Sequence, residues 1–310
     1  MGNNNSSKSN KSKSRKNKQH ISVETELCQE SRNLIFHLPK NDQDIDRMQL
    51  QHFLFEHIWK SNYSSPIEHK LKSCDFKVLD VGCGPGTWLL EMSTQHPLVK
   101  FVGVDIVPVF PSEIKPTNLD FHKCDINQGL PFKDNYFDFV RMSLIATSLK
   151  GDQWNDAIRE LVRVLKPNGY LEIVEKDLQA SNQGPCFKFL TDKFLNFITS
   201  TGVNVHITQQ IPTILSSIPS LTEIRSDVRE IPVGPLGGKF GTIYEELLEM
   251  YIKNNLIDIL PNYMCINEDQ YLDIWKCCQL EFTKFATNYK LFRFWAQKVV
   301  DNEEEVDNFI

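Results

Sequence analysis

The chain has 310 residues, of which 41% are hydrophobic and 24% charged, and its formal net charge is −6. One large folded domain with an appended tail is the natural interpretation of this length and composition. No apolar run approaches the roughly 20 residues needed to cross a bilayer, so no transmembrane helix is expected.

The N-terminal segment differs from the rest of the chain. Its first twenty residues carry six Lys or Arg and no acid, so residues 21–310 carry −12. We expect residues 1–33 to be a disordered basic leader, because they cannot bury a core. A body with a net negative charge repels phosphates, so no nucleic-acid partner is expected through the folded domain.

The first six residues, Met1-Gly2-x-x-x-Ser6, fit the pattern for N-myristoylation of Gly2. One acyl chain with a basic cluster makes a two-signal membrane anchor. This predicts a cytoplasmic protein with membrane-surface association through a myristoylated Gly2 and the basic leader. A soluble low-complexity leader and a nuclear-type basic tract are the alternatives.

The eight cysteines show neither a C-x-x-C pair nor cysteine–histidine ligand spacing. Cys83 lies in a glycine-rich segment, and Cys277 and Cys278 are adjacent in a predicted helix. Buried reduced thiols of a cytoplasmic protein are expected, and no metal site.

The most informative segment is VLDVGCGPGTW, residues 78–88. A short apolar strand carries the acid Asp80 and breaks at Gly82, Gly84 and Gly86, before an apolar helical pattern begins at Trp88. Glycine is needed where the backbone takes a positive φ or lies so close to a ligand that a Cβ would clash. The segment therefore predicts a nucleotide-type ligand at the carboxyl end of a parallel strand.

The glycine spacing separates two classes of ligand. A dinucleotide site requires G-x-G-x-x-G, with its third glycine at position 87, where this chain has Thr87. The order found is G-x-G-x-G behind an acid. This disfavours a nicotinamide-dependent oxidoreductase, as does the lack of a Tyr-x-x-x-Lys pair in a suitable helix.

Two further predicted strands end in acids. KFVGVDI, residues 100–106, ends near Asp105, and LDFHKCDI, residues 119–126, ends near Asp125. An acid at the tip of the second strand suits hydrogen bonds to both ribose hydroxyls of an adenosine. It also disfavours a 2′-phosphate, because two negative charges would meet in a partly buried cleft.

An amphipathic helix is predicted over residues 154–166, and a fifth strand follows over residues 170–175. Asp152 is placed to cap the helix, and Pro167-Asn168-Gly169 to stop it. The apolar face of the helix carries Trp154, Ile158, Leu161, Val162 and Leu165.

Together these motifs resemble those of the class I, seven-strand S-adenosylmethionine-dependent methyltransferases. The glycine triplet behind Asp80 resembles their first motif, and LVRVLKPNGYLEIVE, residues 161–175, resembles their helix–turn–strand signature. The resemblance implies an α/β fold: a doubly wound, mostly parallel seven-strand sheet with helices on both faces. It implies S-adenosyl-L-methionine as the cofactor, with Asp125 accepting a hydrogen bond from the adenine amino group. The cofactor-binding residues implied are Asp80, Gly82, Cys83, Gly84, Gly86, Asp105, Ile106, Asp125 and Ile126.

The resemblance extends over residues 34–300, the expected methyltransferase domain, and leaves an acidic tail over residues 301–310. Residues 38–52 are similar to the helical lead-in of a fungal branch that includes regulators of secondary metabolism, and residues 288–298 to its last strand. One segment departs from the pattern. Relatives often carry an Arg two or three residues after FDFV, whereas here Arg141 follows at once. That segment lines the substrate side in the family, so the family's acceptors are not carried over.

The expected domain divides into a cofactor-binding core, residues 70–177, and an acceptor-side cover, residues 178–287. In the cover, amphipathic helices are predicted over 187–198 and 242–252, and a sixth strand around 221–228. The aromatic residues between 240 and 295 either line an apolar acceptor site or, as is more frequent, pack in the core.

Methyl transfer from a sulfonium is an in-line displacement, so the protein must align the acceptor and exclude water. A base is needed only for a neutral hydroxyl or a protonated amine. The catalytic residue stays unassigned, with Glu175 and Asp177 as candidates, and His52, Tyr63, His206 and Tyr244 behind them. The expected function is methyl transfer to an unidentified small-molecule or protein acceptor. The alternative is a catalytically inactive regulatory scaffold of the same fold that binds the cofactor.

Overall fold

The computed structural model describes residues 38–39 and 41–299. The basic leader, the acylation motif at Gly2 and the acidic tail lie outside these residues, so the predictions made for them stay predictions. Within the described part, no helix is both long and apolar enough to cross a membrane.

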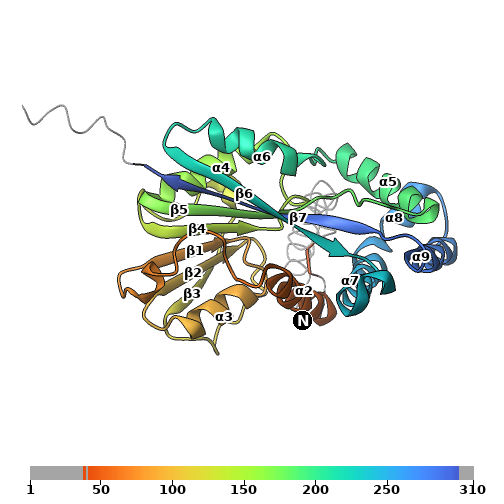
Figure 1. Ribbon diagram of the computed structural model, residues 1–310, viewed down its shortest axis with the longest axis horizontal. Coiled ribbons are helices and arrows are strands. Elements are labelled where there is room, and N and C mark those ends of the chain that lie inside the picture. The colour runs from red at the N-terminus through yellow and green to blue at the C-terminus, as the bar shows by residue number, and fades with distance from the viewer. Residues whose placement is uncertain (1–37, 40, 300–310) are drawn as a thin grey trace, which may run out of the picture. The chain divides into compact units, whose positions relative to one another are not determined.

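A seven-stranded sheet forms the centre of the described unit (Figure 1). Its strands lie in the order β3-β2-β1-β4-β5-β7-β6. The first five pair in parallel, and β7 runs antiparallel to both of its neighbours. The chain winds outward from β1 to β3 and then restarts at β4 on the other side. Open α/β sheets bind ligands at this switch between β1 and β4. The predicted fold class is confirmed.

The strands are β1 (Lys77–Val81), β2 (Lys100–Asp105), β3 (Leu119–Lys123), β4 (Phe137–Ser143), β5 (Leu165–Lys176), β6 (Leu221–Pro232) and β7 (Asn288–Lys298). The α-helices are α2 (Asp42–Trp59), α3 (Thr87–Gln95), α4 (Gln153–Val164), α5 (Pro185–Ser200), α6 (Ile207–Ser216), α7 (Gly238–Met250), α8 (Leu260–Met264) and α9 (Glu268–Phe282). Shorter turns are η1 (Lys70–Lys72), η2 (Ile126–Gln128), η3 (Pro235–Gly237) and the π-helical η4 (Tyr251–Leu256).

The junction of α4 and β5 differs from its prediction. The helix ends at Val164 and the strand begins at Leu165. Pro167-Asn168-Gly169 therefore does not stop the helix but forms a bulge within β5, where Asn168 takes a φ of 63°. The side chain of Asp152 makes no capping hydrogen bond, because this residue is already helical, with a φ of −74°. Apart from these ends, the predicted helix and its buried face are as expected.

Two apolar layers cover the faces of the sheet. On one face Trp154, Ile158 and Leu161 of α4 pack with α6 against β1, β4 and β5. On the other face Leu89 and Met92 of α3 pack with the segment before β1. Figure 1 shows α4 and α6 on one side of the sheet and α3 on the other. Helices on both faces force the parallel strands to be apolar on both sides, which explains their continuous hydrophobic runs.

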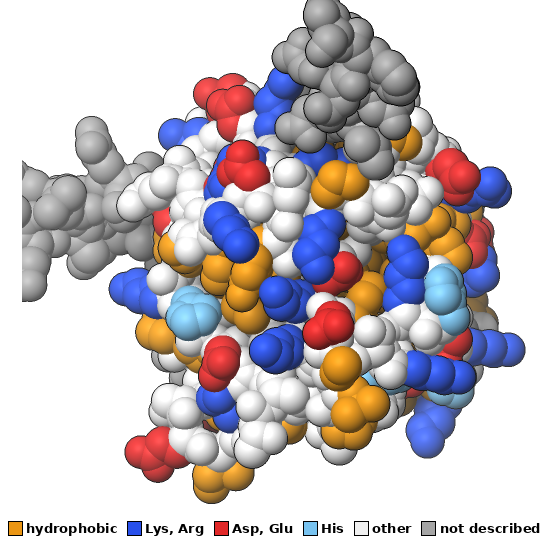
Figure 2. Space-filling model, turned by 90° about the vertical axis from the view of Figure 1, so that its left-hand side faces the viewer, with side chains coloured by type: hydrophobic (Ala, Val, Ile, Leu, Met, Phe, Trp, Pro, Cys, Tyr) orange, Lys and Arg blue, Asp and Glu red, His pale blue; other side chains and the backbone are white. Residues whose placement is uncertain are grey.

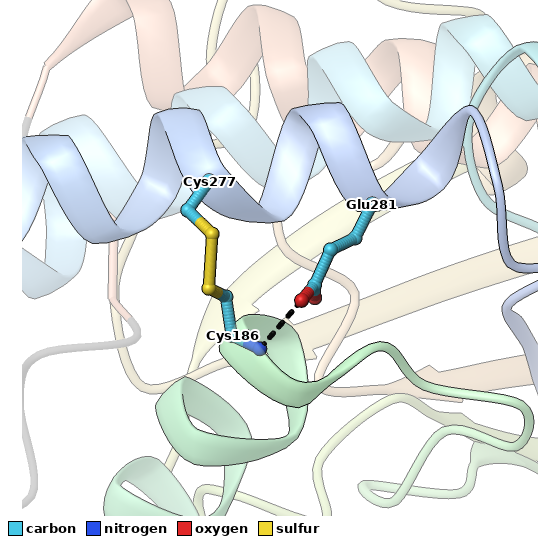
Figure 3. Close-up of side chains that lie close together, drawn as sticks. All are labelled: Cys186, Cys277 and Glu281. Carbon is cyan, nitrogen blue, oxygen red and sulfur yellow. Dashed lines mark hydrogen bonds between the residues drawn. A yellow bond between two sulfur atoms is a disulfide. The ribbon is translucent and has the colours of Figure 1, made fainter.

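A disulfide joins two helices of the cover. Cys186 at the start of α5 is bonded to Cys277 of α9, at a sequence separation of 91 (Figure 3). The Glu281 carboxylate accepts hydrogen bonds from the backbone N–H groups of Cys186 (2.8 Å) and Phe187 (2.9 Å), and so satisfies the first turn of α5. The prediction that the cysteines are reduced is wrong for this pair. It failed because spacing along the chain does not show which helices pack together.

The aromatic residues of the cover serve mainly as core. Trp275 and Phe282 of α9, Tyr244 of α7 and Tyr289 of β7 are all buried, whereas Tyr263 and Phe285 are exposed. The buried rings meet edge to face, with Phe187 and Phe282 at 4.8 Å between centroids. For the buried residues, the prediction that they pack in the core is therefore confirmed.

The face where the parallel strands begin carries several basic side chains, with acidic ones among them (Figure 2). At the starts of β4 and β5, Lys166 pairs with Asp138 at 2.8 Å. Nearby, at the end of α4, Arg163 pairs with Asp134 at 2.6 Å. Acids therefore balance part of the basic charge here.

Candidate active site

The glycine loop joins β1 to α3 at the carboxyl edge of the sheet. Gly82, Gly84 and Gly86 have φ values of +70°, +54° and +74°, a region that other residues rarely adopt. The N–H groups of Gly82 and Cys83 donate to the carbonyl of Val104 in β2, at 2.9 and 3.1 Å. These bonds hold the loop against the end of the second strand.

Side chains from two other segments approach this loop closely. A Cβ on Gly82 would lie 2.7 Å from Ile145 Cγ2, in the segment after β4. A Cβ on Gly84 would lie 2.7 Å from Met48 Cε, on α2. Met48 Cε is the end of a flexible side chain, whereas Ile145 Cγ2 is a branch methyl that moves only with χ1. The space beside the loop is thus bounded by α2 on one side and the β4–α4 segment on the other.

Asp105 lies at the end of β2 and bonds directly to the glycine loop. One carboxylate oxygen accepts from the N–H of Gly84 at 2.8 Å, and the other accepts from Val107 at 2.9 Å. Burial raises the pKa of Asp105, and the backbone donors partly offset this effect. A carboxylate has about four acceptor positions, so capacity remains for a ligand hydroxyl. The next residue, Ile106, is 48% exposed.

The third predicted acid, Asp125, lies at the same edge, beyond the end of β3. It accepts hydrogen bonds from Asn127 N at 3.0 Å and Gln128 Nε2 at 3.3 Å, and so caps the short turn η2. The N–H of Cys124 donates to the carbonyl of Asp105 at 2.9 Å, which brings the two strand ends together. Ile126 is partly buried against the core beneath.

Asp80, within β1, is buried and paired with an arginine. Arg141 lies opposite it on β4, and the distance from Arg141 Nη1 to Asp80 Oδ1 is 2.8 Å. Burial raises the pKa of Asp80, and Arg141 opposes that rise. The guanidinium also lies over the ring of Trp88, 4.6 Å from its centroid. Arg141 was not among the predicted site residues, although an arginine within an apolar strand signals a buried acidic partner.

Next to this ion pair lies a polar cluster, of which only His52 was among the predicted residues. His52 Nε2 on α2 lies 2.8 Å from Glu91 Oε2 on α3. Asn62 Nδ2 donates to the other oxygen of Glu91 at 2.9 Å, and Trp88 Nε1 donates to the carbonyl of Asn62. No motif marks Glu91 and Asn62, because their contacts depend on how α2 packs against α3.

The candidate bases Glu175 and Asp177 both make structural contacts. Glu175 is buried, and its Oε1 accepts from the N–H of Ile145 at 2.7 Å. Burial raises the pKa of Glu175 to about 8. Asp177 accepts a hydrogen bond from the hydroxyl of Thr208 on α6. Glu175 thus fixes the segment that carries Ile145 to the glycine loop.

The remaining candidate bases lie in different surroundings. Tyr63 donates to Glu68, and Tyr244 is buried among aromatic rings. His206 lines an open pocket of about 610 Å³ between α5 and the start of α6. Neither the glycine loop nor the three strand-end acids line that pocket, so His206 is separate from them.

The residues at the loop fit an S-adenosylmethionine-type ligand. The positive-φ glycines let the loop backbone lie close to its neighbours, and Asp105 stands beside it. The hydroxyl oxygen of Thr87, at the first turn of α3, is buried with no hydrogen-bond partner in the described part of the chain. A helix N-terminus and an unsatisfied hydroxyl suit the carboxylate end of such a ligand.

Comparison with known proteins supports the same family. Residues 78–169, from β1 to the bulge in β5, match the family model described as a methyltransferase domain. The secondary metabolism regulator laeA of Coprinopsis cinerea is 33% identical over 146 residues, which cover 46% of this chain and 36% of that protein. This chain thus spans little more than a third of that regulator.

Other relatives are similar over more of their length. The N-methyltransferase sirN of Leptosphaeria maculans is 28% identical over 235 residues, which cover 74% of this chain and 80% of that protein. Among solved structures, phosphoethanolamine N-methyltransferase 2 of Haemonchus contortus, in complex with S-adenosyl-L-methionine, has a TM-score of 0.47. It is 18% identical, and the match covers 81% of this chain and 57% of that chain.

The sheet order, the glycine loop and the matched domain agree with one another. Residues 78–169 match a methyltransferase domain, and the chain resembles the class I S-adenosylmethionine-dependent methyltransferases, including the fungal branch that contains the secondary metabolism regulators.

Proposed function

We propose that this chain binds S-adenosyl-L-methionine at the glycine loop and transfers its methyl group to a small-molecule or protein acceptor. The observation that carries the proposal is the bond between Asp105 and the loop, because it joins the second-strand acid to the positive-φ glycines at one sheet edge. The similarity to the sirN N-methyltransferase over most of both chains supports it.

In this proposal the cofactor, when bound, supplies an activated methyl group on a sulfonium. The chain's own residues do the rest. Asp105 accepts from the ribose hydroxyls, Asp125 from the adenine amino group, and the glycine backbone contacts the amino-acid portion. Glu175 holds the segment after β4, so that Ile145 borders the site and excludes water from it.

A regulatory scaffold is the second candidate function. Two observations favour it: Arg141 already pairs with Asp80, and the ends of Met48 and Ile145 lie close to the loop. Such a protein would bind the cofactor without turning it over. Incubation with tritiated S-adenosylmethionine and a metabolite extract separates the two candidates, because only the enzyme moves label into an acceptor.

A matched pair of glycine variants tests the binding site. Gly84 and Gly238 have similar φ values, +54° and +64°, but only Gly84 has an atom within 4 Å of an added Cβ. In calorimetric titrations with S-adenosylmethionine, we expect Gly84→Val to abolish binding and Gly238→Val to bind as the parent does. Gly238 has a ψ of −152°, a region that essentially only glycine adopts, so the control variant also carries a backbone cost, of about 1–3 kcal/mol. Equal affinities for the two variants would refute the loop assignment.

A further inference from the structure

The contact between His52 and Glu91 fixes an imidazole between two helices. The 2.8 Å distance joins Nε2 of His52, on α2, to Glu91 on α3. Glu91 is itself held by Asn62 and by Gln95, each donating at 2.9 Å. The carboxylate therefore cannot turn away, and the ring is oriented by a partner that is already in place.

This contact also sets which ring nitrogen can act as a base. A carboxylate accepts a hydrogen bond, so the neutral ring carries its hydrogen on Nε2 and leaves the lone pair on Nδ1. Among the described residues, none makes a hydrogen bond to Nδ1. The His52 side chain is 13% exposed, so the ring is held in place without being fully sealed from solvent.

His52 lies on α2 against α3, one helical turn after the residue of α2 that reaches the glycine loop. Met48, one helical turn earlier on the same face of α2, reaches Gly84. Glu91 stands one turn into the helix that follows the loop, and Figure 1 shows α2 beside α3. On the strand side, Arg141 acts electrostatically on His52 while it bonds to Asp80, two residues before Gly82. Residues that contact the loop or flank it in sequence therefore act on the ring from two elements, α3 and β4.

Burial and two nearby arginines favour the neutral form of the ring. Burial lowers the pKa of His52, and the positive charges of Arg141 and Arg293 lower it further, against the opposing effect of Glu91. A pKa below the ordinary value of 6.5 leaves His52 uncharged at neutral pH, with its lone pair available.

We propose that His52, oriented by Glu91, is the general base that takes the proton from a hydroxyl or amine acceptor during methyl transfer. This inference rests on the proposed function. As the acceptor oxygen or nitrogen bonds to the methyl carbon, the carbon–sulfur bond breaks and its electron pair stays on sulfur. The acceptor proton moves to Nδ1 of His52 and later passes to solvent. The products are the methylated acceptor, S-adenosylhomocysteine and one proton.

A titration without any acceptor tests the position of His52. S-adenosylmethionine carries a positive sulfonium where S-adenosylhomocysteine is neutral. A base next to the methyl group should therefore have a pKa lower by about one unit in the first complex than in the second. Histidine signals of the ¹⁵N-labelled full chain are followed by NMR against pH in both complexes, and His52→Gln identifies the relevant signal. His69 and His96, near the starts of β1 and β2, serve as internal controls.

Each outcome is decisive. A shift confined to His52 supports the inference, and equal His52 pKa values in the two complexes overturn it. If neither compound binds, the proposed function itself is refuted. This outcome is distinct from equal pKa values, which refute only the role of His52.

The kinetic arm uses tritiated S-adenosylmethionine and a metabolite extract. Gln can still reach Glu91, so we expect His52→Gln to bind the cofactor within about threefold of the parent. Its transfer of label should fall by a factor on the order of 10²–10⁴. Transfer at the parent's rate would reject the base.

Discussion

At the scale of single residues, the most unusual group is Glu175. It is 1% exposed, and burial raises its pKa to about 8, although backbone N–H groups of the segment after β4 donate to it. These donors favour the charged form, so burial must dominate. Glu175 therefore holds a proton at neutral pH, and its neutral form supports the segment that reaches the glycine loop.

This gives a testable dependence of stability on pH. Between the ordinary value of 4.5 and about 8, the folded protein holds a proton that the unfolded chain has released. The contribution of Glu175 to the free energy of unfolding therefore falls as pH rises through this range. Glu175→Gln keeps an acceptor for Ile145 but has no proton to lose. Urea denaturation gives the free energy of unfolding at pH 5 and at pH 8. Its decrease between these two pH values should be smaller by about 2–5 kcal/mol in the variant than in the parent.

The exposed acid Glu230 provides the control, since Glu230→Gln should leave the decline as it is in the parent. An unaltered decline in Glu175→Gln would show that this carboxyl is ionised in the folded protein.

At the scale of elements, the pair of Arg141 and Asp80 joins β1 to β4 across the switch point of the sheet. Both side chains are buried, so each depends on the other for compensation. Arg141→Met leaves the Asp80 carboxylate alone in the interior, and we expect a loss of about 3–5 kcal/mol at pH 7. The double variant Asp80→Asn, Arg141→Met should recover much of it. Denaturation of all four proteins in the cycle checks this.

The same variant has a sign-specific pH response. Without Arg141, burial raises the pKa of Asp80 unopposed, so protonation relieves the unpaired charge. The deficit of Arg141→Met relative to the parent should therefore shrink as pH falls from 7 toward 5. A deficit that is constant over this range would show that lost packing on Trp88, and not the charge, causes it.

The features that could be predicted from the sequence depend on residues that are close together in the chain. Three glycines that all need positive φ can be placed from spacing. The bounds of β7 were predicted from the resemblance of residues 288–298 to the last strand of the fungal branch. Asp105 was expected to bind a ribose, and it bonds to the loop itself; its role toward the cofactor stays a prediction.

What could not be predicted depends on tertiary packing. Glu91 and Asn62 carry no motif, and only the approach of α2 to α3 brings them to His52. The bulge in β5 was missed because Pro-Asn-Gly resembles a helix stop, whereas pairing with β4 decides that the strand starts earlier. Tertiary pairing overrode the local turn signal.

At the scale of the whole molecule, the disulfide ties α5 to α9 over a separation of 91 residues. Closing so long a loop restricts the unfolded chain, which in the entropic account contributes about 4–5 kcal/mol. Cys277→Ser should lower the free energy of unfolding by about 2–5 kcal/mol and make it insensitive to dithiothreitol. Cys265→Ser, at an exposed free thiol, is the control and should behave as the parent. A parent protein with the same stability with and without reductant would contradict a bonded pair.

The helix α2 touches the glycine loop through Met48, yet it is encoded ahead of the region that the family model matches. Two chains can therefore have identical loops and strand-end acids and still differ in the α2 side chains that border the site. Divergence in acceptor choice among relatives is expected in that preceding stretch. Exchanging residues 42–59 between two such proteins would then transfer preference for an acceptor, while the glycine loop and the strand-end acids stay the same.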